Sequence, residues 1–75
     1  MSTKKEKTLK QLGERISQLR KEKGLTQADL AALVDKDQQS IQRLEKGKIN
    51  PSYYYLLGIA EGMGLSIGDL LEERK

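Results

Sequence analysis

Two residue types that carry much protein chemistry are absent from this chain of 75 residues, which contains no cysteine and no histidine. Without thiolates and imidazoles the chain lacks the usual nucleophile, the usual general base and the commonest ligands of structural zinc. Its carboxylates do not cluster at the spacing of a magnesium- or calcium-binding loop, and no phosphate-binding glycine loop is visible. We therefore expect no enzymatic activity, no metal site and no cofactor.

Long apolar runs are also missing. No stretch approaches the ~20 apolar residues of a membrane-spanning helix, and the N-terminal lysines are not followed by the apolar region of a signal peptide. A chain of this length forms one domain with one small core. Because disulfides are impossible, a helical bundle is among the few stable arrangements. We expect a single, cytoplasmic, all-α domain.

Charge is distributed unevenly along the chain, whose net charge is +3. Residues 1–23 carry +5, residues 24–50 are neutral and residues 51–75 carry −2. A basic N-terminal third suits a polyanionic partner, although the same lysines could simply keep a solvated tail soluble. Residues 1–7 lack apolar periodicity, so we expect a disordered basic arm there, followed by a single domain over residues 8–75.

Apolar residues at helical spacing, with cap residues between them, predict five helices. The expected N-caps of the last four helices are Thr26, Asp37, Ser52 and Ser66, and the expected helix-ending glycines are Gly24, Gly47 and Gly64. The side chains expected to face the core are Leu9, Leu12, Ile16, Leu19, Ile41, Leu44, Leu56, Ile59, Ala60 and Met63.

The segment from Leu25 to Pro51 is the most informative about function. Its pattern predicts two short helices joined by a tight turn at Asp35-Lys36, with Asp35 in the left-handed conformation. The second of these helices, residues 37–46, turns amide and cationic side chains outward. Glutamine can donate and accept hydrogen bonds, which matches adenine in the major groove, and arginine matches guanine or a phosphate. The alternative is a polar face that only contacts solvent.

Several short motifs in this segment resemble the helix-turn-helix domain of the phage repressor and Cro family, also called the Xre family. The motifs are Thr26-Gln27, Leu30-Ala31, Gln38-Gln39-Ser40-Ile41, Leu44-Glu45-Lys46-Gly47-Lys48 and Asn50-Pro51-Ser52. The resemblance covers residues 9–71 and implies a compact five-helix, lambda-repressor-like fold. The chain departs from the family pattern in the turn, where the family usually has glycine and then an apolar residue in place of Asp35 and Lys36.

The resemblance implies a set of DNA contacts on the reading helix and its flanks. Gln38 and Gln39 would read A·T base pairs, and Gln42 and Arg43 would read or position the neighbouring steps. Gln27 would bind a phosphate and hold the first reading glutamine. The full set of expected DNA-binding residues is Gln27, Gln38, Gln39, Ser40, Gln42, Arg43, Lys46, Lys48 and Asn50.

The resemblance also implies an ion pair between Arg20, at the end of the first helix, and Glu45, at the end of the third. Such a pair would fix the reading helix on its scaffold; the alternative is two unrelated surface charges. Tyr53 is expected at the edge of the core. Tyr54 and Tyr55 are then expected outside, either as phosphate or interface contacts or as surface residues without a special role.

One such domain makes few base contacts, and operators for this motif are usually two-fold symmetric. We therefore expect a weak homodimer through the last helix and the loop before it. The candidate interface residues are Leu65, Ile67, Leu70 and Leu71, some of which must also pack inward. The leading function is a sequence-specific transcriptional regulator, such as a repressor, that binds double-stranded DNA. Phage repressor, restriction–modification controller and antitoxin with a toxin partner stay open, as does a module of this fold that binds only protein.

Overall fold

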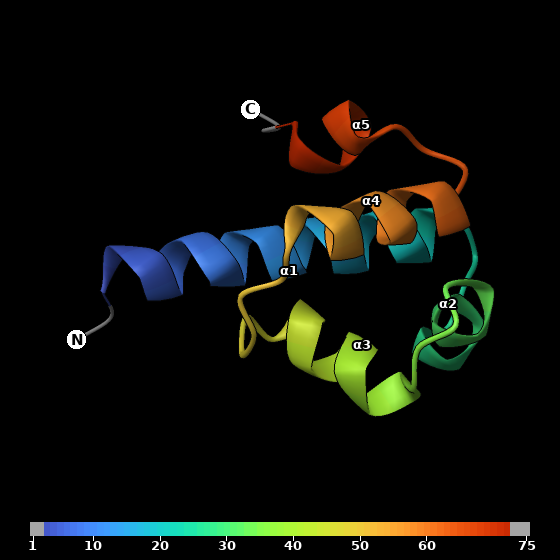
Figure 1. Ribbon diagram of the computed structural model, residues 1–75, viewed down its shortest axis with the longest axis horizontal. Coiled ribbons are helices and arrows are strands. Elements are labelled where there is room, and N and C mark those ends of the chain that lie inside the picture. The colour runs from blue at the N-terminus through green and yellow to red at the C-terminus, as the bar shows by residue number, and fades with distance from the viewer. Residues whose placement is uncertain (1–2, 73–75) are drawn as a thin grey trace.

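Five helices follow one another along residues 3–72, the part of the chain that the computed structural model describes (Figure 1). No strand occurs in that range, so the prediction of an all-α fold is confirmed. The helices are α1 (Lys4–Glu22), α2 (Gln27–Leu33), α3 (Gln38–Glu45), α4 (Tyr53–Gly62) and α5 (Ile67–Leu71).

The predicted caps set the ends of these helices. The side chains of Thr26 and Ser66 accept hydrogen bonds from the backbone N–H three residues on, and a carboxylate at that position bonds back in each case. Asp37 and Ser52 cap α3 and α4 through one such bond each. Three helices end at glycines with φ near +73°, a conformation that glycine adopts without strain: Gly24, Gly47 and Gly64. All seven predicted cap positions are confirmed.

The predicted disorder of residues 1–7 is wrong for the residues that the structure describes. Helix α1 begins at Lys4, and Thr3 is its N-cap. The Thr3 N–H donates to Glu6 Oε1 at 2.8 Å, and the Glu6 N–H donates to Thr3 Oγ1 at 3.1 Å. This capping box satisfies two N–H groups at the helix start, so the helix extends beyond its packed part. Residues 1 and 2 lie outside the described range.

One core joins all five helices. Its buried apolar residues are Ile16, Leu19, Leu30, Ala31, Ile41, Leu44, Leu56, Ile59, Ala60, Met63 and Leu70. Leu9 and Leu12 are only half-buried. The prediction is confirmed for Tyr54, which is 83% exposed, but it is wrong for the other two tyrosines: Tyr53 is 63% exposed, whereas Tyr55 is half-buried. Tyr55 lies one turn before the buried Ile59, on the same face of α4.

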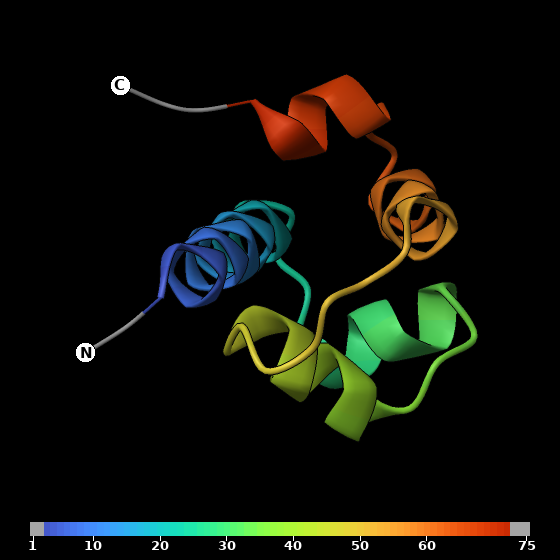
Figure 2. The same ribbon diagram turned by 60° about the vertical axis from the view of Figure 1, so that its left-hand side comes forward.

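The helices stack so that α3 and α5 lie on opposite sides of the molecule (Figures 1 and 2). Helices α1 and α4 lie between them. Helix α3 packs against α1 and α2, and α5 packs against α1 and α4. As a result α3 has one face on the scaffold and one free face.

Gly13 sets how closely α1 approaches α3. A Cβ atom at this position would lie 2.4 Å from the carbonyl oxygen of Glu45 and 2.5 Å from that of Leu44. Both distances are far shorter than a van der Waals contact, so only glycine fits here without movement of the backbone. Neither apolar periodicity nor a turn signal marks this glycine in the sequence.

Candidate nucleic-acid interface

Helix α3 presents its polar residues to solvent because its apolar residues hold the other face. Ile41 and Leu44 are fully buried, with exposed fractions of 0% and 1%. The residues that the sequence predicts to face outward are all exposed: Gln38, Gln39, Gln42 and Arg43. Two of them, Gln38 and Gln39, lie in the first turn of the helix. Their identification as DNA contacts stays a prediction.

The connection between α2 and α3 is a tight turn with one left-handed residue. Asp35 has φ of 56°, as predicted. The Lys36 N–H donates to the Ala31 carbonyl at 2.9 Å, which closes the end of α2. The Asp37 carboxylate then accepts the Ser40 N–H at 2.7 Å and starts α3. Three consecutive residues thus reverse the chain and begin the next helix.

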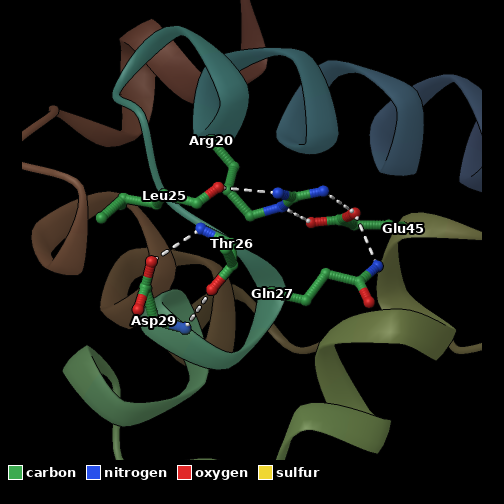
Figure 3. Close-up of polar contacts among 6 residues, drawn as sticks. All are labelled: Arg20, Leu25, Thr26, Gln27, Asp29 and Glu45. Carbon is green, nitrogen blue, oxygen red and sulfur yellow. Dashed lines mark hydrogen bonds and ion pairs between the residues drawn. The ribbon is translucent and has the colours of Figure 1, made fainter.

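The predicted ion pair between α1 and α3 is confirmed (Figure 3). Arg20 Nε donates to Glu45 Oε2 at 2.6 Å, and Arg20 Nη2 donates to Glu45 Oε1 at 3.0 Å. A third bond joins Arg20 Nη1 to the Leu25 carbonyl at 2.8 Å. The side chains of Arg20 and Glu45 are 9% and 6% exposed. One guanidinium therefore ties the end of α3 to α1 and to the loop before α2.

The environment keeps both partners charged at neutral pH. Burial raises the pKa of Glu45, but hydrogen bonds from Arg20 and Gln27 and the charge of Arg20 outweigh it, so the pKa lies below the ordinary value of 4.5. The hydrogen bond to Glu45 raises the pKa of Arg20. Buried charges that lack such partners would be strongly unfavourable.

Gln27, the first residue of α2, makes a contact that the resemblance does not imply. Its Nε2 donates to Glu45 Oε1 at 3.0 Å (Figure 3), and the residue is half-buried. The charged acceptor on α3 is within reach of this amide, so Gln27 joins α2 to the ion pair. A phosphate contact, which the second N–H of the amide leaves possible, stays a prediction.

Basic and polar residues continue past the end of α3. Lys46, Lys48 and Asn50 are exposed, whereas Ser40 in α3 is half-buried. The Lys48 N–H donates to the Arg43 carbonyl at 2.9 Å, which orders the start of this loop.

Tyr55 of α4 lies near the start of α3, a position that the sequence did not indicate. Burial raises the pKa of its hydroxyl, and the negative charge of Asp37 adds to the effect. The Lys36 ammonium lies 5.0 Å from the centre of its ring, within cation–π range.

The predicted dimer surface is only partly available. Leu70 is wrong as an interface residue, because it is fully buried in the core of the monomer. Leu65 and Ile67 are half-buried and pack against that core. Leu71 is 50% exposed and is the most accessible of the four. Helix α5 has one buried stripe, and Leu70 occupies it.

Whether the described residues contain a metal site, a membrane-spanning helix or a groove also bears on function. No group of three or more carboxylates there is positioned to hold a metal ion. None of the helices in residues 3–72 is both long and apolar enough to cross a membrane. The surface of the described residues includes a shallow groove of about 590 Å³ between α1 and α5, and another of about 250 Å³ between α4 and the turn before α3.

Two short helices joined by a tight turn, with the second helix fixed to a scaffold on one face and exposed on the other, define a helix-turn-helix domain. Residues 16–70 match the model of a protein family described as helix-turn-helix. The chain belongs to this helix-turn-helix family. By its family and its relatives it is a DNA-binding transcriptional regulator.

Curated relatives and a solved structure are similar over most of the chain. An uncharacterized HTH-type transcriptional regulator, y4dJ, of Sinorhizobium fredii is 37% identical over 62 residues, 83% of this chain and 80% of that protein. Control protein C.MunI of a Mycoplasma species is 36% identical over 62 residues, 81% and 84% of the two chains. The crystal structure of the restriction–modification controller protein C.AhdI from Aeromonas hydrophila has a TM-score of 0.84 and 31% identity, covering 87% of this chain and 98% of that one.

Proposed function

We propose that the chain represses transcription by placing α3 in the major groove of double-stranded DNA and reading base edges. The observation that carries this proposal is the pair of exposed glutamines in the first turn of a helix whose opposite face is fully buried. A rigid helix with amide groups at its leading end has the geometry of direct readout.

The proposed roles divide between reading and positioning. Gln38 and Gln39 read A·T pairs, and Gln42 and Arg43 read or position the adjacent steps. Phosphates of the DNA backbone are bound by the residues that flank these: Gln27, Lys46, Lys48 and Asn50. The half-buried Ser40 completes the DNA-binding set. The Arg20–Glu45 pair contacts no DNA in this proposal, but it fixes the angle at which α3 leaves the scaffold.

The test of the reading role is selection of bound sites from a random duplex library, repeated with Gln38→Ala. We expect the wild type to enrich a two-fold symmetric site. The variant should lose its preference at one base pair in each half, because a bidentate amide–adenine contact contributes ~1–3 kcal/mol of discrimination. Gln18→Ala, which removes an exposed amide from α1, should leave the selected site unchanged.

Two other results would count against this assignment. An unchanged site with Gln38→Ala would remove Gln38 from the readers. No enrichment at low salt would favour the second candidate function, a domain that binds only a protein partner such as a toxin. A DNA binder loses affinity steeply as salt rises because it releases counterions, so a salt titration separates the two.

The assembly is proposed to be a weak homodimer through α5 and the loop before it. Helix α5 lies on the side of the molecule opposite α3 (Figure 2), and Leu71 is the exposed apolar residue there. In a two-fold interface every contact occurs twice. We favour the restriction–modification controller among the regulator types, because two of the similar proteins carry that kind of name. A cytoplasmic location fits such a role.

Sedimentation measures this assembly. Leu71→Asp should raise the dimer dissociation constant about tenfold or more, because losing the burial of even part of two leucines costs over ~1.4 kcal/mol. Leu33→Asp is the matched control, since Leu33 is similarly exposed, at 57%, but lies on α2. Wild-type protein that stays monomeric at high concentration, with and without operator DNA, would contradict the homodimer.

A further inference from the structure

The first two turns of α1 extend past the helices that pack around its C-terminal half (Figure 1). Residues 3–8 are exposed throughout, yet they are helical from Lys4. The capping box between Thr3 and Glu6 holds the start of this extension. Its lysines therefore project from an ordered helix, and binding through them does not carry the cost of ordering a flexible arm.

The extension lies beside the end of α3. A Cβ atom on Gly47 would lie 2.8 Å from the Cα atom of Lys10, so the loop after α3 touches the backbone of α1 at this residue. Figures 1 and 2 both show that loop running next to α1. Lys46 and Lys48 flank Gly47 in the loop.

Helical spacing adds Lys7 to this cluster, because residues three apart share a face of a helix. Lys7, Lys10, Lys46 and Lys48 are all exposed. Two carboxylates lie near them on α1, those of Glu6 and Glu14. Glu6 is engaged by the Thr3 N–H in the capping box, and the charge of Lys48 acts on it. The cluster keeps a positive excess.

We propose that Lys7 and Lys10 bind phosphates of the DNA strand that passes the end of α3, so that the interface extends along the backbone beyond the reading helix. This inference rests on the proposed reading of the major groove by α3. When α3 lies in that groove, its end and the following loop meet a strand at the groove wall. The extension of α1 starts at that loop and continues in the direction away from the bundle (Figure 1). Lysine ammonium groups bind phosphates as point charges.

The test compares two double variants with the same loss of charge. Lys7→Gln with Lys10→Gln removes the proposed contacts, and Lys21→Gln with Lys23→Gln removes two exposed lysines near the other end of α1. The slope of log K against log salt concentration is negative, and its magnitude should decrease by about 2 for the first variant, at about 1 for each lost phosphate contact. The control should keep the wild-type slope.

Two further readouts separate this inference from the function on which it rests. The first variant should select the same operator as the wild type, because phosphate contacts carry no base information. Shortening the duplex at the ends of the operator should lower the DNA affinity of the wild type and of the control. It should not lower the affinity of the variant that lacks Lys7 and Lys10. Equal slopes for the two variants would overturn the phosphate contacts while leaving reading by α3 intact. Wild-type protein that binds no duplex at low salt would overturn both.

Discussion

Replacing Arg20 by alanine is expected to lower the free energy of unfolding by about 3–5 kcal/mol, the cost of leaving a buried charge without its partner. The variant leaves the Glu45 carboxylate, 6% exposed, without its cationic partner, although the uncharged Gln27 amide still donates to it. It also removes the donor to the Leu25 carbonyl. A domain of this size is stable by only ~4–11 kcal/mol, so much of the protein should be unfolded well below the wild-type melting temperature.

A second variant keeps this prediction testable if Arg20→Ala does not fold. Replacing both partners by methionine removes both charges and keeps the volume, and such replacements of buried pairs are often neutral or stabilising. We expect Arg20→Met with Glu45→Met to recover most of the lost stability in thermal melts. Arg20→Ala protein that melts at the wild-type temperature would show that the pair contributes nothing.

Stability at acid pH gives a second measurement of the same pair. The pKa of Glu45 is lower in the folded protein than its ordinary value of 4.5. Its contribution is therefore present above pH 4.5 and is lost as the pH falls through the folded pKa. The capping carboxylates Asp29, Asp37 and Asp69 also have lowered pKa values, because backbone N–H groups bond to them. The double methionine variant keeps these three carboxylates but lacks Glu45. It should therefore lose less stability in acid than the wild type, and the difference between the two proteins measures the contribution of Glu45.

Gly13→Ala is the second substitution with a large expected effect. The added methyl group would lie 2.4–2.5 Å from two carbonyl oxygens of α3, and these are backbone atoms that cannot rotate away. Overpacking of this kind costs about 1–3 kcal/mol or more, against a gain of ~1 kcal/mol from the better helix propensity of alanine. We expect a net loss of stability and, because α3 must move relative to α1, a loss of DNA affinity greater than the loss of stability explains.

Gly58→Ala is the matched control for that substitution. Gly58 lies inside α4, and a Cβ atom there would meet nothing within 4 Å. Only the propensity gain remains, so this variant should be more stable than the wild type by about 0.5–1 kcal/mol. Denaturant melts of the two variants measure the difference. A Gly13→Ala protein that is as stable as Gly58→Ala would show that α1 and α3 are not packed as tightly as the structure has them.

Local signals in the sequence were enough to place the helices. A capping residue, a glycine with positive φ and an apolar stripe each act within one or two turns, so their effect does not depend on the rest of the fold. For this reason the caps at Thr26, Asp37, Ser52 and Ser66 are confirmed, as is the left-handed Asp35. The start of α1 carries a signal of the same kind, since Thr3 and Glu6 have capping-box spacing. The prediction for residues 1–7 rested on their lack of apolar periodicity and did not use this signal.

Contacts between helices could not be predicted in this way. The role of Gly13, the attachment of Gln27 to Glu45 and the burial of Tyr55 in place of Tyr53 depend on which residues of other helices lie opposite. Leu70 and Leu71 are neighbours of the same type, yet one is in the core and the other half exposed. The sequence alone determined the helices, their ends other than the start of α1, and the polar face of α3. The tertiary structure decided which side chains meet, because burial and pairing arise where helices cross and not from periodicity within one helix.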